Sequence, residues 1–197
     1  MKTNNSQSKK RTVQKTGHVF EKMNILKLFF ENPEKDFHVR EIARALRQSP
    51  STISKLLTKL TKHETLISRE EKKFKLFKSN TENKIYKETK LFYNILNIRQ
   101  SGLIDYLINH YNHPSAIILF GSFRKAENIP SSDIDLFIQS SIKKESSLTE
   151  FENTLNHKIQ LFVYSQKETE LMKTKNKELL NNIINGIVLD GFLEVFT

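Results

Sequence analysis

The sequence contains no cysteine and no apolar run that approaches the roughly 20 residues of a membrane-spanning helix. Without cysteine, disulfide frameworks and cysteine-based zinc sites are excluded, which fits a reducing compartment. The N-terminal stretch, MKTNNSQSKKRTVQKTG, also lacks the apolar segment of a secretory signal peptide. We therefore expect a cytoplasmic protein without a membrane partner.

Positive charge is concentrated in the first half of the chain, which has a formal net charge of +10. Residues 1–90 contain 22 Lys and Arg against 10 Asp and Glu, whereas residues 91–197 contain 10 against 12. A clustered basic surface is typical of nucleic-acid binding. A solubilising lysine-rich surface would give the same composition. Residues 1–17 are interpreted as a disordered basic arm.

Two short apolar runs flank a Gly-Ser pair and an Asp-x-Asp pattern. Residues 116–120 are apolar and rich in β-branched side chains, which predicts a buried strand, and residues 136–138 belong to a second strand. Because side chains alternate along a strand, Asp133 and Asp135 are expected on one face, roughly 7 Å apart. The apolar residues between and after them would face a core.

Paired carboxylates beside a Gly-Ser turn suit a divalent metal that carries phosphates, because Mg²⁺ prefers carboxylate and phosphate oxygens. Gly121 would let the backbone approach the phosphates closely. Ser122, at the start of a helix, would offer a hydroxyl and backbone amides to an anion. Arg124 and Lys125 follow directly, and they could contact a triphosphate or lie on the solvated surface.

This pattern resembles the signature of the nucleotidyltransferase superfamily that includes DNA polymerase beta and the minimal nucleotidyltransferases. That signature is Gly-Ser, a spacer of about ten residues and Asp-x-Asp; here ten residues, 123–132, form the spacer. The resemblance implies a mixed sheet flanked by helices over residues 113–197. It also implies transfer of a nucleoside monophosphate from a nucleoside triphosphate, with Mg²⁺ held by the catalytic pair Asp133 and Asp135.

Active members of the superfamily carry a third carboxylate on a neighbouring strand. The run KIQLFVY, residues 158–164, predicts that strand, and the matching position holds Gln160. An amide is neutral and ligates divalent metals poorly beside carboxylates. Glu150 and Glu152 lie nearby, but on a predicted helix over residues 148–155.

Two functions stay open at this point. The first is an active transferase, for which the resemblance allows a protein tyrosine, an RNA end or a small molecule as acceptor. The second is a transcription regulator whose degenerate second domain senses a nucleotide or mediates assembly. Some minimal nucleotidyltransferases act in toxin–antitoxin pairs, but no residue of this sequence identifies a toxin partner.

The first half contains two predicted amphipathic helices and a hairpin. Apolar residues recur at helical spacing over residues 39–46 and again over 53–60, and Ser49-Pro50 predicts the start of the second helix. Residues 66–69 and 74–78 flank a charged turn, 70–73. This arrangement resembles the winged helix-turn-helix of bacterial and archaeal regulators over residues 18–80, although winged helices can also bind protein.

The resemblance implies binding to double-stranded DNA through the outer face of the second helix and through the hairpin, or wing. The residues expected to make these contacts are Ser51, Thr52, Lys55 and Lys59 on the helix, and Arg69, Lys72, Lys73 and Lys75 on the wing.

Residues 81–112 are predicted to be a linker helix that breaks near Ser101-Gly102. The expected apolar stripe consists of Ile85, Phe92, Leu96, Leu103 and Leu107. This stripe could pair with a second chain, giving a homodimer or another protein complex, or pack against the domains of its own chain. We thus expect an α/β (α+β) protein with an N-terminal winged helix-turn-helix and a C-terminal nucleotidyltransferase-like domain.

Overall fold

A computed structural model describes residues 23–195 and divides the chain into two compact units, residues 1–86 and 87–197. The predicted basic arm, residues 1–17, lies outside the described residues. Within residues 23–195, no helix has both the length and the hydropathy that crossing a membrane would require.

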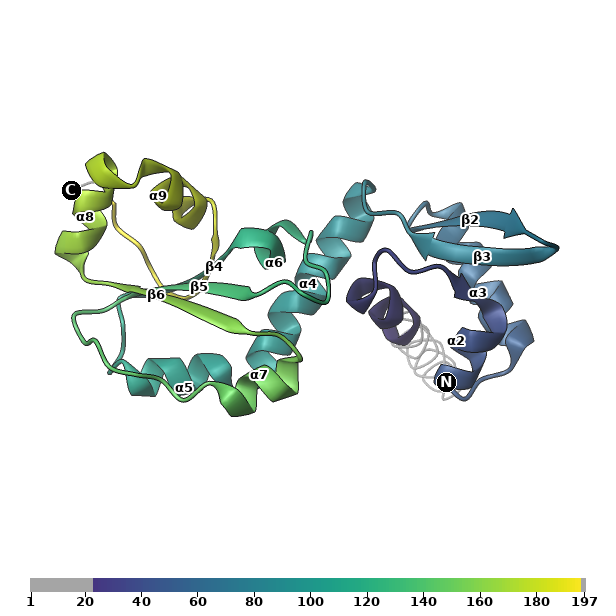
Figure 1. The fold of residues 1–197 in the computed structure, drawn as a ribbon, viewed down its shortest axis with the longest axis horizontal. Coiled ribbons are helices and arrows are strands. Elements are labelled where there is room, and N and C mark those ends of the chain that lie inside the picture. Colours follow the sequence, from purple (N-terminus) through teal and green to yellow (C-terminus); the bar gives the residue numbers. More distant parts are fainter. Residues whose placement is uncertain (1–22, 196–197) are drawn as a thin grey trace, which may run out of the picture. The chain divides into compact units, whose positions relative to one another are not determined.

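The first unit runs helix, strand, helix, helix, strand, strand. Its three strands form an antiparallel sheet in the order β1-β3-β2. Figure 1 shows β2 and β3 side by side as a hairpin. The described part of the first helix covers residues 23–31. The bounds of the later elements are β1 Phe37–His38, α2 Val39–Ala45, α3 Pro50–Lys62, β2 Leu66–Glu71 and β3 Phe74–Ser79.

The start of α3 is confirmed as predicted. The Ser49 hydroxyl accepts a hydrogen bond from the Thr52 amide at 3.2 Å, and Pro50 occupies the first turn, where a missing N–H is tolerated. The apolar face is buried, which fixes the opposite, polar face toward solvent. The buried residues of α3 are Ile53, Leu56, Leu57 and Leu60.

The hairpin turn is tighter than the predicted four-residue turn. Glu71 pairs with Phe74, so only Lys72 and Lys73 connect β2 and β3. Both have positive φ, 46° and 67°, as the type I′ turns of two-residue hairpins require. Phe74 is exposed, whereas Leu76 and Phe77 of β3 are both buried.

The second unit contains a four-stranded sheet in the order β6-β5-β4-β7, in which β5 and β6 are parallel and the other neighbours antiparallel. Helices cover both faces, with α5 and α7 on one side and α8 and α9 on the other (Figure 1). The predicted mixed sheet flanked by helices is confirmed. Helix α4, Lys84–Gln100, begins in the last residues of the first unit and continues into the second. The other bounds are α5 Leu103–His110, β4 Ala116–Phe120, α6 Gly121–Lys125, β5 Ile134–Gln139, α7 Thr149–Leu155, β6 Ile159–Tyr164, α8 Gln166–Lys175, α9 Lys177–Ile184 and β7 Ile187–Gly191.

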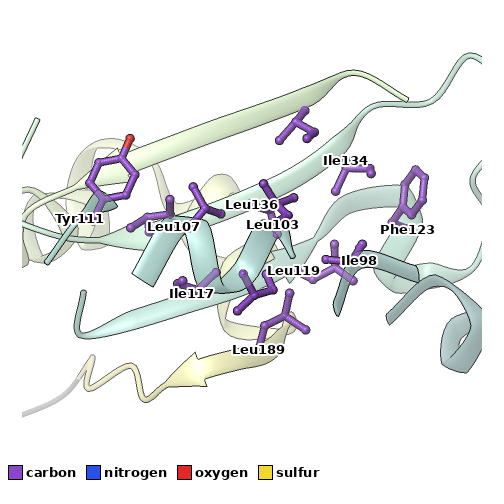
Figure 2. Close-up of a cluster of buried hydrophobic side chains, with 13 residues drawn as sticks. Ile98, Leu103, Leu107, Tyr111, Ile117, Leu119, Phe123, Ile134, Leu136 and Leu189 are labelled. Carbon is purple, nitrogen blue, oxygen red and sulfur yellow. The ribbon is translucent and has the colours of Figure 1, made fainter. Parts of the chain in front are cut away.

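Alternation along the central strands builds a core on each face. In β4, Ile117 and Leu119 join a cluster with Ile98 and Leu107 (Figure 2), whereas Ile118 joins a second cluster under α8 and α9. The apolar residues of β5 that were expected to face a core do so in the first cluster. They are Ile134, Leu136 and Ile138.

The predicted apolar stripe is wrong for α4. Ile85 and Phe92 are 57% and 59% exposed, whereas Lys90 and Asn94 are 1% and 3% exposed. Polar side chains can be buried where they are hydrogen-bonded, and this masked the true buried face of the helix. The break near Gly102 is confirmed, and Leu103 and Leu107 of α5 are buried as expected.

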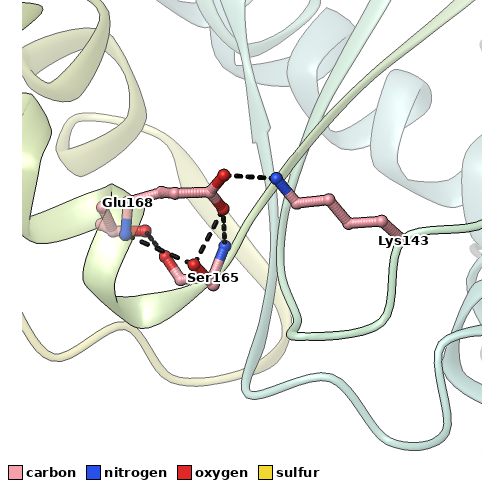
Figure 3. A network of polar contacts seen from close by, with 4 residues as sticks. Lys143, Ser165 and Glu168 are labelled. Carbon is pink, nitrogen blue, oxygen red and sulfur yellow. Dashed lines mark hydrogen bonds and ion pairs between the residues drawn. The ribbon is translucent and has the colours of Figure 1, made fainter.

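No element was predicted for residues 166–175, which form α8. The helix begins with a capping box in which Ser165 and Glu168 exchange hydrogen bonds, and Lys143 forms an ion pair with Glu168 (Figure 3). The Lys143 hydrogen bond and the Ser165 amide lower the pKa of Glu168 to about 2. The polar loop after β5 is thereby joined to the start of α8.

Candidate active site

The Gly-Ser turn and the Asp-x-Asp pattern meet at one end of the sheet. Strand β4 ends at Phe120, and the short helix α6 starts at once with Gly121. Because β4 and β5 are antiparallel, the end of β4 lies opposite the start of β5, and Phe120 pairs with Asp135. Residues that are more than ten positions apart in sequence therefore share one site.

Gly121 is required by both its backbone and its neighbour. Its φ of +67° is a conformation that side chains rarely adopt, and a Cβ atom built on it would lie 2.0 Å from Oδ2 of Asp135. The sequence predicted a glycine that lets phosphates approach. In the structure the group already lying against this glycine is the carboxylate of Asp135.

Asp133, Asp135 and Gln160 form a polar cluster on one face of the sheet. Asp135 pairs with Gln160 across the parallel strands β5 and β6, and Gln160 Nε2 donates to Asp133 Oδ2 at 2.9 Å. Gln160 therefore occupies the neighbouring-strand position that the sequence predicted. Burial raises the pKa of the half-buried Asp135 carboxyl, and the nearby Asp133 charge raises it further.

The carboxylates of Asp133 and Asp135 fit a divalent cation whose other ligands are water and substrate oxygens. A raised carboxyl pKa reflects an anion that burial and a like charge disfavour, and a bound cation would relieve both effects. Mg²⁺ commonly uses one or two carboxylates and completes its shell with water and substrate phosphates. In the described part of the chain, no group of three or more His, Cys, Asp or Glu side chains comes together to hold a metal.

The remaining predicted nucleotide-binding residues differ in surroundings. Ser122 is half-buried in the first turn of α6. Arg124 Nε is buried and has no hydrogen-bond partner among the described residues, so this donor is available to a ligand that reaches it. Lys125 is exposed at the end of α6. The structure brings Gly121 against Asp135. Among the hydrogen bonds and ion pairs of the described residues, none joins Arg124 or Lys125 to the aspartates.

A pocket of about 330 Å³ lies beside Asp133, between the loop before β5 and the junction of α7 and β6. His157 lines it and donates through Nδ1 to the Ser132 carbonyl at 2.8 Å, a contact that sequence analysis missed. Glu152, which lies near the site in sequence, accepts hydrogen bonds from Lys158 and from the Ile159 amide. These contacts hold Glu152 at the start of β6.

The residues predicted to bind DNA from α3 are exposed. Lys55 and Lys59 lie on the outer face of the helix, opposite its buried apolar residues. The Ser51 and Thr52 hydroxyls lie 2.9 and 2.8 Å from the Ser49 hydroxyl at the helix start. Lys55 and Lys59 are therefore accessible to a ligand. The hydroxyls of Ser51 and Thr52 are exposed as well, but they already form hydrogen bonds with Ser49.

The predicted wing residues fall into two groups. Lys72 and Lys73 form the exposed tip of the hairpin, with Lys75 following on β3. Arg69 instead forms ion pairs with Asp36 at 3.0 Å and Glu71 at 2.7 Å, and its hydrogen bond lowers the pKa of Asp36. Any phosphate contact of Arg69 would therefore compete with two carboxylates.

Comparison with known families agrees with the geometry of the second unit. Residues 102–190 match a family model described as Polymerase beta, Nucleotidyltransferase. This match supports a nucleotidyltransferase domain in that part of the chain, and it includes Gly121, Asp133 and Gln160. No curated protein and no solved structure matches the chain.

Substitution of Gly121 by alanine should displace the Asp135 carboxylate. Gly121→Ala and Gly102→Ala both place a Cβ at positive φ, which costs about 1 kcal/mol of backbone strain. Only the former also drives a Cβ into Asp135, since no atom lies within 4 Å at Gly102. We therefore expect both variants to lose stability in urea unfolding, with the larger loss in Gly121→Ala.

The two variants should differ in the Asp135 titration followed by NMR. The collision moves the carboxylate toward water, so its pKa should fall toward the ordinary value in Gly121→Ala and stay raised in Gly102→Ala. An unchanged Asp135 pKa in Gly121→Ala would show that the close approach does not hold the carboxylate in place.

Proposed function

We propose that this protein transfers a nucleoside monophosphate from a nucleoside triphosphate to an acceptor hydroxyl, and that its first unit binds double-stranded DNA. The observation that carries the transferase proposal is the contact between Gly121 and Asp135. It joins the two halves of the Gly-Ser and Asp-x-Asp pattern within the segment that matches the family model.

In this proposal Asp133 and Asp135 hold Mg²⁺, in keeping with the divalent metals that nucleotidyltransferases of this family generally use. The ion, when bound, neutralises phosphate charge and orients the triphosphate for displacement. Gly121 leaves the backbone open to the phosphates, Ser122 offers its hydroxyl, and the buried Nε of Arg124 offers a donor.

Gln160 favours a second candidate function. The acceptor hydroxyl must lose a proton during transfer, and an amide cannot take it. Gln160 instead donates to Asp133 and steadies a carboxylate that lies near a second one. A nucleotide-sensing regulator would bind Mg²⁺ and nucleotide in its second domain without turnover. Such a protein would use the hydrogen bond that holds Asp133 in place, and it would need no general base.

The DNA proposal rests on the first unit alone. Its order of helices and strands, the three-stranded sheet and the two-residue hairpin support a winged helix-turn-helix. Exposed Lys55 and Lys59 on α3, together with the lysines at the hairpin tip, provide positive charge for phosphates. Asp36 and Glu71 neutralise Arg69, so the charge surplus of the wing lies at its tip.

Calorimetry with ATP, GTP, CTP or UTP and Mg²⁺ tests the site. Wild-type protein should bind at least one of them with Mg²⁺-dependent affinity, and Asp133→Asn/Asp135→Asn should lose at least tenfold in affinity and the Mg²⁺ dependence, because the metal loses both charged ligands. Glu170→Gln/Glu178→Gln, which changes two exposed carboxylates elsewhere, is the matched control. Equal affinity for wild type and the aspartate variant would reject the assignment.

Changing Gln160 to glutamate separates the two candidate functions. If transfer lacks only a base, Gln160→Glu should raise the rate by about 100-fold or more, because a positioned base typically contributes about 10²–10⁴-fold. Transfer of label from α-labelled nucleoside triphosphate is the measurement, with Gln160→Met as the control that loses the hydrogen bond and adds no base. If wild type and Gln160→Glu transfer label at the same rate, another group takes the proton.

Neutralising the wing tip should weaken binding to every DNA sequence. Lys72→Gln/Lys73→Gln/Lys75→Gln removes three exposed charges, and the slope of affinity against salt should flatten by about one unit for each phosphate that is no longer neutralised. Fluorescence anisotropy of the full chain with duplex DNA measures this, with Lys144→Gln/Lys167→Gln/Lys177→Gln as the charge-matched control. Absence of binding at low salt would identify the first unit as a protein-interaction module.

A further inference from the structure

Two polar residues of α4 are buried on one face of the helix. Lys90 and Asn94 are 1% and 3% exposed, and they are four positions apart, so they lie one turn apart on the same side. Ile98, the next residue on this face, belongs to the hydrophobic core of the second unit. The buried ammonium and amide groups lie on the same helix face as this core residue. Burying such polar groups is unfavourable unless they form hydrogen bonds.

Those partners are backbone and side-chain atoms next to the candidate active site. Lys90 Nζ donates to the Asn128 carbonyl at 2.6 Å. Asn94 Nδ2 donates to the Asn128 side-chain oxygen at 2.9 Å and to the Phe123 carbonyl at 3.0 Å. One face of α4 is thus hydrogen-bonded to α6 at Phe123. The same face is hydrogen-bonded to the loop after α6 at the buried Asn128.

This loop connects the two halves of the site. It leaves α6 through Ala126, whose φ is 57°, and the Glu127 amide donates back to the Ser122 carbonyl at 2.9 Å. Toward the other end, Ile129 and Ser132 are joined by two hydrogen bonds, and Asp133 follows directly. Asn128 lies between these two closed turns, so fixing it fixes the path from Ser122 to Asp133.

Burial of Lys90 disfavours its charged form. Burial lowers the pKa of the Lys90 ammonium from its usual range to about 8. Between about pH 8 and the ordinary lysine pKa the unfolded chain binds the extra proton, so stability rises with pH across that interval. At neutral pH the fold is therefore less stable than it would be if Lys90 carried no charge in either state.

We propose that Lys90 and Asn94 are positioning residues for the candidate active site, which hold α6 and residues 126–132 so that Gly121 and Ser122 meet Asp133 and Asp135 in binding geometry. The inference rests on the proposed function for what the site binds. The clamp itself is a property of the free protein.

Hydrogen–deuterium exchange of the full chain without nucleotide tests the clamp. Lys90→Met keeps the shape of the side chain and removes the donor, so amides of residues 126–132 should exchange at least tenfold faster, while amides of β4 and β5 keep their protection. Ile98→Val on the same helix face is the control, expected to lower the melting temperature without that local change.

Nucleotide binding is measured in parallel, with Asn94→Ala as the second variant. Weaker Mg²⁺–nucleotide affinity, by at least fivefold, is expected wherever exchange of residues 126–132 has accelerated. Unchanged exchange in both Lys90→Met and Asn94→Ala overturns the clamp, whatever the protein binds. Accelerated exchange in a protein whose wild type binds no Mg²⁺–nucleotide supports the clamp and rejects the proposed function instead.

Discussion

The close approach of the Asp135 carboxylate to Gly121 is the constraint on which the second unit depends. It requires the register in which Phe120 pairs with Asp135, because a shift of one residue would turn the aspartates to the opposite face. The same register directs Ile134 and Leu136 into the core. Core packing and the polar cluster are thus two results of one strand pairing.

Much of this arrangement could be predicted because the signals are local. The apolar run of β4, the alternation of β5 and the spacing from Ser122 to Asp133 each lie within a short stretch, and the expected strands are present. The place of Gln160 on the neighbouring strand was implied by the resemblance to the nucleotidyltransferase superfamily, and the structure pairs it with Asp135. Strand periodicity specifies which side chains share a face, and that is most of what defines this site.

What could not be predicted depends on partners that are distant in sequence. Lys90 reads as a surface residue until Asn128, 38 positions away, supplies its carbonyl. Arg69 reads as a free cation until Asp36, 33 positions away, pairs with it. A prediction from hydrophobic periodicity places polar side chains on the solvent side. The prediction is wrong where the fold buries a polar side chain and provides its hydrogen bonds. The same assumption placed Phe92 on the buried face of α4, where the structure instead exposes it.

The two-residue turn at Lys72 and Lys73 has a consequence for proteolysis. Exposed lysines at a loop tip would ordinarily invite cleavage by trypsin-like enzymes. A protease binds its substrate as an extended segment, and both lysines have left-handed backbone angles fixed by the strand pairing on either side. Cleavage there would first require the hairpin to open, so these accessible lysines are protected by the pairing of β2 with β3.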